Sequence, residues 1–356
     1  MRLLICAGGT GGGVYPALTV TGTLKSEDHT LLWVGSEGGM EAELVQRTGL
    51  PFTTIPAAGL HGVSLNRLPG NLVKLWNGYW KSRRILREFK PDVLLFTGGY
   101  VAIPMALAGV KYQSLLYVPD IEPGLAIKTL ARYSDRIAVT VNESRHYFNQ
   151  QEKITVTGYP IREELTKWTK SEALAYFGFD SSLPTLLFMG GSSGARSINK
   201  AVTAIVPNLI EKYQIIHLTG HLDWDSVRKQ TETLGPRYQA FPFLHEAGSA
   251  LAAADLVISR SGASVLGEYP YFGLPAILVP YPYAWRYQKV NADYLVGKGA
   301  AILLEDDKLA TDLQPSIENL FEEPAKLHAM QKAMAQLSQP KAAERISALL
   351  LEMAER

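Results

Sequence analysis

The sequence has almost no cysteine, no long apolar run and almost no net charge. Cys6 is the only cysteine among 356 residues, so an internal disulfide is excluded and a reducing compartment is expected. A formal net charge of +1 argues against nucleic acid as a partner, because nucleic-acid-binding proteins carry a marked basic excess. No stretch approaches the roughly 18 uninterrupted apolar residues of a membrane span, and the N-terminus lacks the pattern of a secretion signal. We therefore expect a cytoplasmic protein.

The length and the apolar content predict two well-buried domains. Short apolar runs that end in glycine, serine or proline alternate with helix-like segments, which is the pattern of a parallel α/β sheet. The runs of the first part lie at residues 2–7, 30–35, 92–99, 114–120, 136–141 and 153–158, and those of the second part at 184–191, 213–220, 238–244, 255–262 and 275–281. The rhythm restarts after Gly158, so we expect two doubly wound domains with a cleft between them.

We place the boundary of these domains near Gly158–Arg162. Residues 1–158 then form the first domain and residues 159–339 the second. The last segment, residues 340–356, is a strong helix former that can pack back on either domain, and we group it with the first.

The first glycine-rich segment, AGGTGGG at residues 7–13, follows the first predicted strand. In an open parallel sheet, ligands bind beyond the carboxyl ends of the strands, where bare backbone permits close approach. The spacing fails as a dinucleotide fingerprint, because Val14 stands where the last glycine is needed, and no Gly-Lys-Ser/Thr follows for a P-loop. The segment therefore indicates either a ligand-facing turn of another kind or close packing of a helix on a strand.

The second part of the chain repeats this device at residues 190–194, GGSSG. Such a strand-to-helix turn suits diphosphate oxygens, through its N–H groups and the Ser192 hydroxyl. A further polar turn, beginning at residue 259, runs into Glu268, whose carboxylate either binds the hydroxyls of a ribose or complements a helix dipole. Taken together, these features favour a site for a nucleoside-diphosphate sugar.

These motifs, in this order, resemble the MurG family of glycosyltransferases. The matching segments are GGTGG with VYPAL (8–12, 14–18), TGGY (97–100), PGLA (123–126), GYPIR (158–162), GGSSGARSIN (190–199), and RSGA with GLPAILVPYP (260–263, 273–282). The resemblance implies the GT-B fold, in which two Rossmann-like domains face each other across a cleft. It implies inverting transfer of GlcNAc from UDP-GlcNAc to lipid I, the undecaprenyl-pyrophosphate-linked muramyl pentapeptide, in peptidoglycan synthesis, and it implies no cofactor.

The resemblance also carries the family's donor site onto this sequence. It places the donor diphosphate at Arg162 and Ser192, the ribose at Glu268, the uracil against the main chain of Leu244, and the sugar hydroxyls at Gln288. The segment that would wrap the nucleotide comprises Ala263, Ser264, Val265, Leu266, Gly267 and Glu268. The family's frequent second glutamine is replaced here by Lys289.

The acceptor side departs from the family pattern. Gly13 stands where the family has a histidine near the reacting centre, and the family's HEQN before PGLA is replaced by YVPD, which ends at Asp120. An inverting transfer needs a proton acceptor. Asp120 and Glu122 are the candidates, with Asp120 preferred and turn capping the alternative for each. The residues expected to line the acceptor side are Thr10, Gly11, Gly12, Gly13 and Tyr100, with a structural cap as the alternative for Tyr100.

No residues of the sequence form a convincing metal site. His217 and His221 flank a predicted strand end without a carboxylate at useful spacing, so we interpret them as structural. We expect Arg162 and the turn at Ser192 to stabilise the departing UDP without a metal.

Residues 72–90 combine six basic side chains with one acidic side chain and with Trp76, Tyr79 and Trp80 between them. This pattern is typical of a helix lying on anionic lipid, although a crossover helix can bury the same apolar stripe against its sheet. The MurG family places its membrane contact in this region. The resemblance therefore implies peripheral attachment to the cytoplasmic face of the cell membrane through Trp76, Tyr79, Trp80 and Lys81.

Two other functions remain open at this point. One is transfer of the same kind of UDP-sugar to a different lipid acceptor, which the absent histidine and HEQN favour. The other is a catalytically silent homologue that binds a UDP-sugar. A non-hydrolysing UDP-GlcNAc epimerase shares the two-domain architecture, but the motifs match the transferase better.

Overall fold

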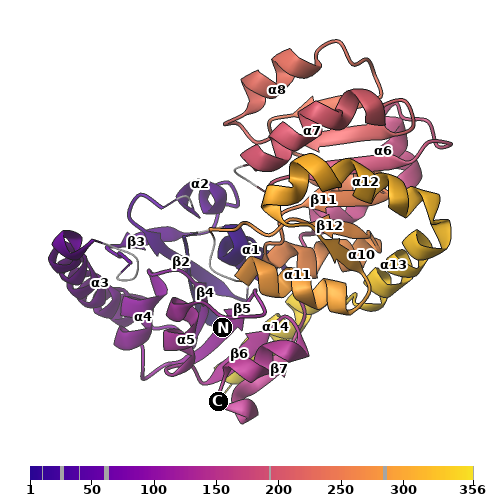
Figure 1. The fold of residues 1–356 in the computed structure, drawn as a ribbon. Helices are drawn as coiled ribbons and strands as arrows, with labels where there is room; N and C mark the ends of the chain where they lie inside the picture. The colour runs from indigo at the N-terminus through magenta and orange to yellow at the C-terminus, as the bar shows by residue number, and fades with distance from the viewer. Residues whose placement is uncertain are drawn as a thin grey trace. The chain divides into compact units, whose positions relative to one another are not determined.

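The protein is described by a computed structural model, which covers residues 1–9, 11–24, 28–39, 41–59, 64–191, 194–283 and 287–355 (Figure 1). The chain divides into two compact units. The first comprises residues 1–160 together with 341–356, and the second comprises residues 161–340. Each unit is an α/β layer structure built around one parallel sheet.

The first unit is built on a seven-stranded sheet of order β3-β2-β1-β4-β5-β6-β7, with every neighbouring pair parallel. Its strands are β1 (Arg2–Ala7), β2 (Thr30–Ser36), β3 (Phe52–Ile55), β4 (Val93–Gly98), β5 (Gln113–Val118), β6 (Arg136–Val139) and β7 (Ile154–Val156). The order reverses between β1 and β4, and such a switch point is where open α/β sheets bind ligands.

The helices of the first unit cover both faces of this sheet. They are α1 (Gly11–Thr23), α2 (Glu41–Gln46), α3 (Leu68–Phe89), α4 (Ala102–Ala108), α5 (Leu125–Ala131) and α14 (Ala342–Ala354), with 3-10 turns η1 (Leu65–Arg67), η2 (Asn142–Tyr147) and η3 (Gln151–Lys153). The last helix, α14, packs against α1 and buries Ile346 and Leu350 in the core beneath β1 and β4 (Figure 1). Arg345 of this helix donates to the main-chain oxygen of Thr157 at 2.6 and 2.9 Å. The C-terminal segment is thus part of the first unit.

The second unit repeats the strand order of the first. Its six-stranded sheet has the order β10-β9-β8-β11-β12-β13, again with all pairs parallel. The strands are β8 (Thr185–Met189), β9 (Gln214–Leu218), β10 (Tyr238–Phe241), β11 (Leu256–Ser259), β12 (Ala276–Leu278) and β13 (Ala301–Leu303). The switch point lies between β8 and β11.

Eight α-helices and three 3-10 turns complete the described part of the second unit. The helices are α6 (Lys170–Phe177), α7 (Arg196–Leu209), α8 (Trp224–Thr231), α9 (Ala247–Ala253), α10 (Glu268–Phe272), α11 (Tyr287–Gly297), α12 (Leu309–Glu322) and α13 (Pro324–Gln336), and the 3-10 turns are η4 (Glu163–Lys167), η5 (Ala263–Leu266) and η6 (Asp306–Lys308). The core of this unit gathers the buried faces of α7 and α12 on the strands.

Two strands of the structure, β3 and β13, are missing from those predicted by the sequence. Both are edge strands of their sheets. They have four and three residues. In β3 two threonines interrupt the apolar residues, so it lacks the long apolar run that marks a central parallel strand. β13 lies within the apolar run of residues 300–304, which was not among the predicted strands. The remaining strands lie where the apolar runs predict them.

Helix α3 packs through small residues rather than through its aromatic side chains. Its buried positions are Gly78, Ser82 and Leu86. A Cβ on Gly78 would lie 2.2 Å from the main-chain oxygen of Pro56, so glycine allows the helix to approach this close. Leu86 is buried whereas Leu72 is 55% exposed, so these two apolar residues of α3 do not share one buried side of the helix.

Candidate functional site

The switch point of the first unit brings two glycine turns together. A Cβ on Gly99, which follows β4, would lie 2.4 Å from the main-chain oxygen of Gly8, which follows β1. Gly9, Gly98 and Gly99 have φ angles of +94°, +117° and +82°, values that side-chain-bearing residues rarely adopt. The glycines therefore serve close contact between two turns at the ligand-binding edge of the sheet. Thr10, expected on the acceptor side, lies outside the described residues.

Gly13 lies in the first turn of α1, where it faces the end of β4. Thr97 Oγ1 donates a 2.8 Å hydrogen bond to the main-chain oxygen of Gly13. A Cβ at this position would lie 3.0 Å from the main-chain oxygen of Thr97, so even a methyl group needs a small displacement. Any side chain at this position, where the family has histidine, would therefore need a small shift of α1 or of the end of β4. Gly11 and Gly12 precede it in the same helical turn and are partly exposed.

Tyr100 ends the turn after β4 and is 42% exposed. Its ring lies over Gly59, where a Cβ would approach ring atom Cε2 to 2.8 Å. Asn71 of α3 donates a 2.7 Å hydrogen bond to the main-chain oxygen of Gly59. Tyr100 therefore holds the segment after β3, and part of its surface still faces solvent.

The two candidate bases follow β5 in different surroundings. Asp120 is half-buried. Glu122 is 8% exposed, and its Oε1 lies 3.7 Å from Lys128 Nζ in α5. The ammonium group of Lys128 also lies 5.7 Å from the centroid of the Tyr147 ring. A buried carboxylate beside a lysine is well placed to fix the loop onto α5, whereas Asp120 is the more accessible of the two.

The switch point of the second unit carries the other glycine turn. A Cβ on Gly190 would lie 2.2 Å from the main-chain nitrogen of Ala195, and one on Gly194 would lie 2.2 Å from the main-chain oxygen of Thr219, which follows β9. Gly191 and Gly194 have φ angles of +82° and +78°. The turn is thus closed tightly on itself and on its neighbour. Ser192 lies outside the described residues.

Arg162 and Glu268, predicted from separate motifs, lie together in the structure. Arg162 Nη2 is 3.9 Å from Glu268 Oε1, and the two side chains are 27% and 12% exposed. Burial raises the pKa of Glu268, and the Arg162 charge and the Ser264 hydroxyl oppose that rise. Ser264 belongs to η5, which packs on α10. The structure therefore places a cation, a carboxylate and the Ala263–Leu266 turn side by side.

Gln288 lies next to the turn after β11. Its main-chain oxygen accepts a 2.7 Å hydrogen bond from Ser261 Oγ, and its side-chain oxygen accepts one of 2.9 Å from the Tyr281 main-chain nitrogen. Lys289, the departure from the family glutamine, pairs with Asp293 one turn along α11 at 2.9 Å. Leu244 follows β10 and is buried.

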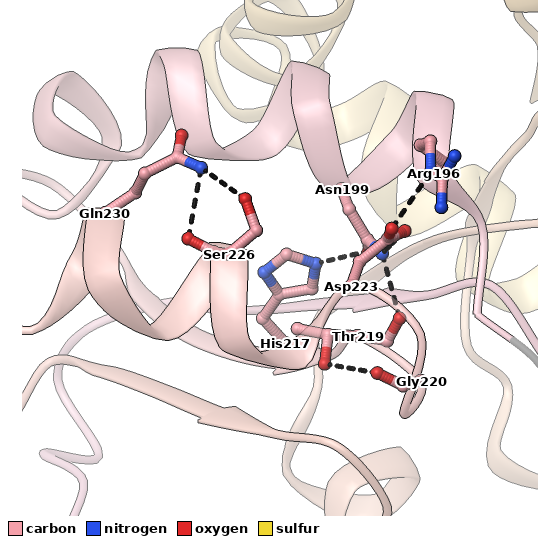
Figure 2. Close-up of polar contacts among 8 residues, drawn as sticks. All are labelled: Arg196, Asn199, His217, Thr219, Gly220, Asp223, Ser226 and Gln230. Carbon is pink, nitrogen blue, oxygen red and sulfur yellow. Dashed lines mark hydrogen bonds and ion pairs between the residues drawn. The ribbon is translucent and has the colours of Figure 1, made fainter.

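Asn199, in the GARSIN motif, organises a buried polar network behind the second glycine turn (Figure 2). Its Nδ2 donates to Thr219 O at 2.8 Å and to Asp223 Oδ2 at 3.0 Å, so its Oδ1 accepts from His217 Nε2 at 2.9 Å. Tyr238 then donates to the other ring nitrogen of His217, at 2.8 Å. Asp223 also accepts a 3.0 Å bond from Arg196 Nε.

The His217 imidazole is therefore a structural group. It is fully buried, and burial lowers its pKa to about 3. Both of its ring nitrogens are hydrogen-bonded, in accord with the structural interpretation of this residue. His221 stacks against Phe243 with a centroid distance of 6.4 Å. Within the described ranges, no three His, Cys, Asp or Glu side chains are grouped as metal ligands.

Sequence reasoning missed two residues that hold the turns. Arg260 donates to Asp306 Oδ1 at 2.5 Å, to Ser197 Oγ at 2.7 Å and to Val279 O at 3.1 Å, and so joins the ends of β11 and β12 to α7. Glu41, at the start of α2, is completely buried beside the first glycine turn. The charge of each residue was visible in the sequence, but its partners are distant along the chain.

The fold and two family models define the class of this protein. The glycosyltransferase family 28 N-terminal domain matches residues 3–139, and the glycosyltransferase family 28 C-terminal domain matches residues 185–346. A crystal structure of MurG from Acinetobacter baumannii superposes with a TM-score of 0.78 at 22% identity over 99% of both chains. UDP-GlcNAc 2-epimerase from Neisseria meningitidis, solved with UDP-GlcNAc bound, gives 0.71 at 14% identity over 99% of this chain and all of that one. The chain is a two-domain glycosyltransferase with the GT-B fold.

Curated relatives narrow this class. The UDP-N-acetylglucosamine–N-acetylmuramyl-(pentapeptide) pyrophosphoryl-undecaprenol N-acetylglucosamine transferase of Roseiflexus sp. is 37% identical, over 98% of this chain and 94% of the relative. The transferase of the same name from Desulforudis audaxviator is 38% identical, over 99% of both chains. This chain belongs to the MurG family of glycosyltransferases.

Proposed function

We propose that the chain transfers GlcNAc from UDP-GlcNAc, with inversion, to the undecaprenyl-pyrophosphate-linked muramyl pentapeptide, the lipid I to lipid II step of peptidoglycan synthesis. The observation that carries the proposal is the grouping of Arg162 with Glu268 and η5, because two separate family motifs, GYPIR and the segment that begins with RSGA, supply these residues. The names of the full-length relatives support the same donor and acceptor.

The donor would bind to the second unit. The ribose hydroxyls would be held by the Glu268 carboxylate, and the Ala263–Leu266 turn with Gly267 would wrap the nucleotide. Arg162 and the turn containing Ser192 would take the diphosphate, Leu244 the uracil, and Gln288 the sugar hydroxyls. The side-chain oxygen of Gln288 would have to leave the Tyr281 nitrogen, or reach the sugar through its amide nitrogen.

The transfer would exchange one bond to the anomeric carbon for another. An acceptor hydroxyl oxygen attacks this carbon, the bond to the diphosphate oxygen breaks, and its electron pair leaves with UDP. The Arg162 guanidinium stabilises the charge that develops on the departing diphosphate. The hydroxyl proton goes to a base, which we propose to be Asp120 rather than Glu122, because Glu122 is buried beside Lys128.

Release of UDP with purified lipid acceptors tests this function. Wild-type protein should release UDP from UDP-GlcNAc in the presence of lipid I and form lipid II. Asp120→Asn should lower kcat at least about 100-fold, whereas Glu122→Gln should change it much less. Unchanged turnover in Asp120→Asn would exclude this residue as the base.

A different lipid acceptor is the second candidate function, favoured by the tight packing of Gly13 against Thr97. A panel containing lipid I, diacylglycerol and other isoprenoid-linked sugars separates the two. UDP release with an acceptor other than lipid I supports this second function. Binding of UDP-GlcNAc without release on any acceptor supports the silent homologue.

We also propose that α3 attaches the protein to the cytoplasmic face of the membrane. Trp76 and Trp80 are 62% and 49% exposed, and their ring centroids lie 5.8 Å apart. Tyr79 is half-buried beside them, and Lys81 is exposed and pairs with Glu37 at 3.1 Å. No helix of the described residues is both long enough and apolar enough to cross a bilayer.

Flotation with anionic vesicles tests this attachment. The triple variant Trp76→Ser, Trp80→Ser, Lys81→Glu should lose most vesicle binding, because it removes two apolar anchors and reverses a charge. A control with Tyr176→Ser and Lys332→Glu changes exposed residues of the second unit and should float like wild type. Equal flotation of wild type and the triple variant would exclude α3 as the contact.

A further inference from the structure

Glu41 is a completely buried carboxylate at the switch point of the first unit. It begins α2, five residues after β2 ends at Ser36. Its side chain points back toward the end of β2 and toward the turn after β1.

Three protein donors surround the carboxylate. Oε1 accepts from the main-chain nitrogen of Ser36 at 2.6 Å and from the Ser36 hydroxyl at 2.6 Å. Oε2 accepts a longer bond of 3.4 Å from the main-chain nitrogen of Gly9. Glu41 therefore links the end of β2 to the first glycine turn, 32 positions away in the chain.

Three glycines form the pocket for this side chain. A Cβ on Gly8 would lie 2.5 Å from Glu41 Oε1, one on Gly39 would lie 2.3 Å from the same atom, and one on Gly35 would lie 2.9 Å from Glu41 Cγ. Gly35 lies in β2 and Gly39 in the turn after it, whereas Gly8 follows the neighbouring strand β1. Part of the bare backbone after β1 is thus required by Glu41.

The second glycine turn of this unit extends the same contact. Gly99 packs on Gly8, where its Cβ would lie 2.4 Å from the main-chain oxygen. Gly8 therefore lies between Glu41 and Gly99 and contacts both. A substitution of Glu41 can thus displace both glycine turns that border the switch point.

We propose that Glu41 is a positioning residue for the acceptor side of the transfer reaction. Its carboxylate fixes Gly9 and thereby the start of α1, where Gly11–Gly13 face the acceptor; this inference rests on the proposed function. Glu41 acts through the turn and does not contact the substrates. Substitution of Glu41 should weaken binding of the lipid acceptor and leave binding of UDP-GlcNAc unchanged, because the proposed donor residues belong to the second unit.

Glu41→Gln tests this role with little change of shape. The amide oxygen of glutamine can keep both Ser36 bonds, and its NH₂ group then meets the Gly9 N–H, donor against donor. We expect the KM for lipid I to rise at least about tenfold, while the KM for UDP-GlcNAc stays within about twofold. The thermal midpoint should change by only a few degrees.

Glu43→Gln is the matched control. Glu43 lies in the same helix, its side chain is 76% exposed, and it pairs with Arg47 at 2.5 Å. This variant should match wild type in both KM values. A folded Glu41→Gln protein with an unchanged KM for lipid I would overturn the proposal, as would an equal rise in both KM values.

Amide hydrogen exchange tests the inference independently of the acceptor. Glu41→Gln should speed exchange in residues 8–13 and leave residues 190–195 unchanged, even if wild type proves inactive on lipid I. If the wild type is inactive on lipid I but residues 8–13 exchange faster in Glu41→Gln, the proposed acceptor is rejected and the positioning role of Glu41 is kept. Unchanged exchange in residues 8–13 would reject that role.

Discussion

The two units share a strand order, and each places a glycine turn at its switch point, yet the turns are supported differently. After β1 the turn is held by the charged side chain of Glu41. After β8 the turn lies against the carbonyl of Thr219, which is held by the neutral amide of Asn199. Behind Asn199 stands a neutral imidazole, that of His217.

This difference bears on which ligand each turn can accept. A carboxylate that binds the Gly9 N–H occupies one of the donors a phosphate would need, and its charge repels an anion. The second turn has no such carboxylate bonded to its described residues, and Arg162 in the same unit can balance a diphosphate. The comparison favours the second unit for UDP and assigns a positioning role to the first turn.

The largest expected effect is a loss of folding stability, caused by an alanine substitution in the glycine turn of either unit. Gly99→Ala and Gly194→Ala each insert a Cβ 2.4 and 2.2 Å from a main-chain oxygen, at φ angles of +82° and +78°. We expect each to destabilise its own unit by about 5 kcal/mol, because clash and backbone strain add. Urea unfolding and UDP titration would measure both effects. Only Gly194→Ala should abolish UDP binding in protein that remains folded.

Gly38→Ala and Gly178→Ala are the controls for this pair. Both glycines have positive φ, but a Cβ there has no neighbour within 4 Å. Each of these two substitutions should lower the free energy of unfolding by about 1 kcal/mol, because it introduces backbone strain without a clash. If Gly99→Ala costs no more than Gly38→Ala, the contact between Gly8 and Gly99 is not tight, and the comparison of the two turns fails.

Acid should weaken the second unit through His217. Its pKa of about 3 in the folded protein lies below the roughly 6.5 of an unfolded histidine, so the unfolded chain binds more protons between these values. The stability contributed by the neutral ring is complete above about pH 6.5 and falls as the pH drops, by about 3 kcal/mol at pH 4. Urea midpoints from pH 7 to pH 4 would show this loss.

A His217→Gln variant separates this effect from the rest of the chain. It lacks the titrating ring, so its urea midpoint should depend less steeply on pH than that of wild type. Parallel curves for the two proteins would contradict the assignment of acid sensitivity to His217.

The smallest expected effect concerns Gly13. Gly13→Ala and Gly13→His both insert a Cβ 3.0 Å from the Thr97 oxygen, which should cost about 1 kcal/mol. We expect both to lower turnover, because bare backbone is needed at this position. Thermal melts and UDP release would measure the two changes. A rise of turnover in Gly13→His alone would instead mean that the imidazole supplies a catalytic group this chain lacks.

The sequence predicted the parts of the site that depend on local pattern. The central strands follow from continuous apolar runs, and the glycine turns follow from their place at strand ends. Glu268 was already marked by its place after a polar turn, whereas Arg162 came from the family resemblance, and the structure places the two side chains 3.9 Å apart. The roles of the individual site residues remain predictions for the experiments above.

What the sequence could not predict depends on contacts between distant segments. Glu41 packs against Gly35 and Gly39, which are near it in the chain, and against Gly8, which follows β1, and no local spacing marks the contact with Gly8. The partners of Asn199 lie on β9 and in the turn after it, so the amide in GARSIN gives no sign of them beforehand. The sequence also could not predict that the aromatic side of α3 is exposed, because the contact of Gly78 with Pro56 decides which side of the helix is buried.

The return of α14 to the first unit has a consequence for how the protein is made. The core of that unit includes Ile346 and Leu350, which leave the ribosome only after the whole second unit has been synthesised. At roughly 5–20 residues per second, the nascent first sheet waits on the order of ten seconds or more for its last helix. During that interval the apolar surface beside α1 is uncovered, so we expect chaperones to bind the nascent first unit.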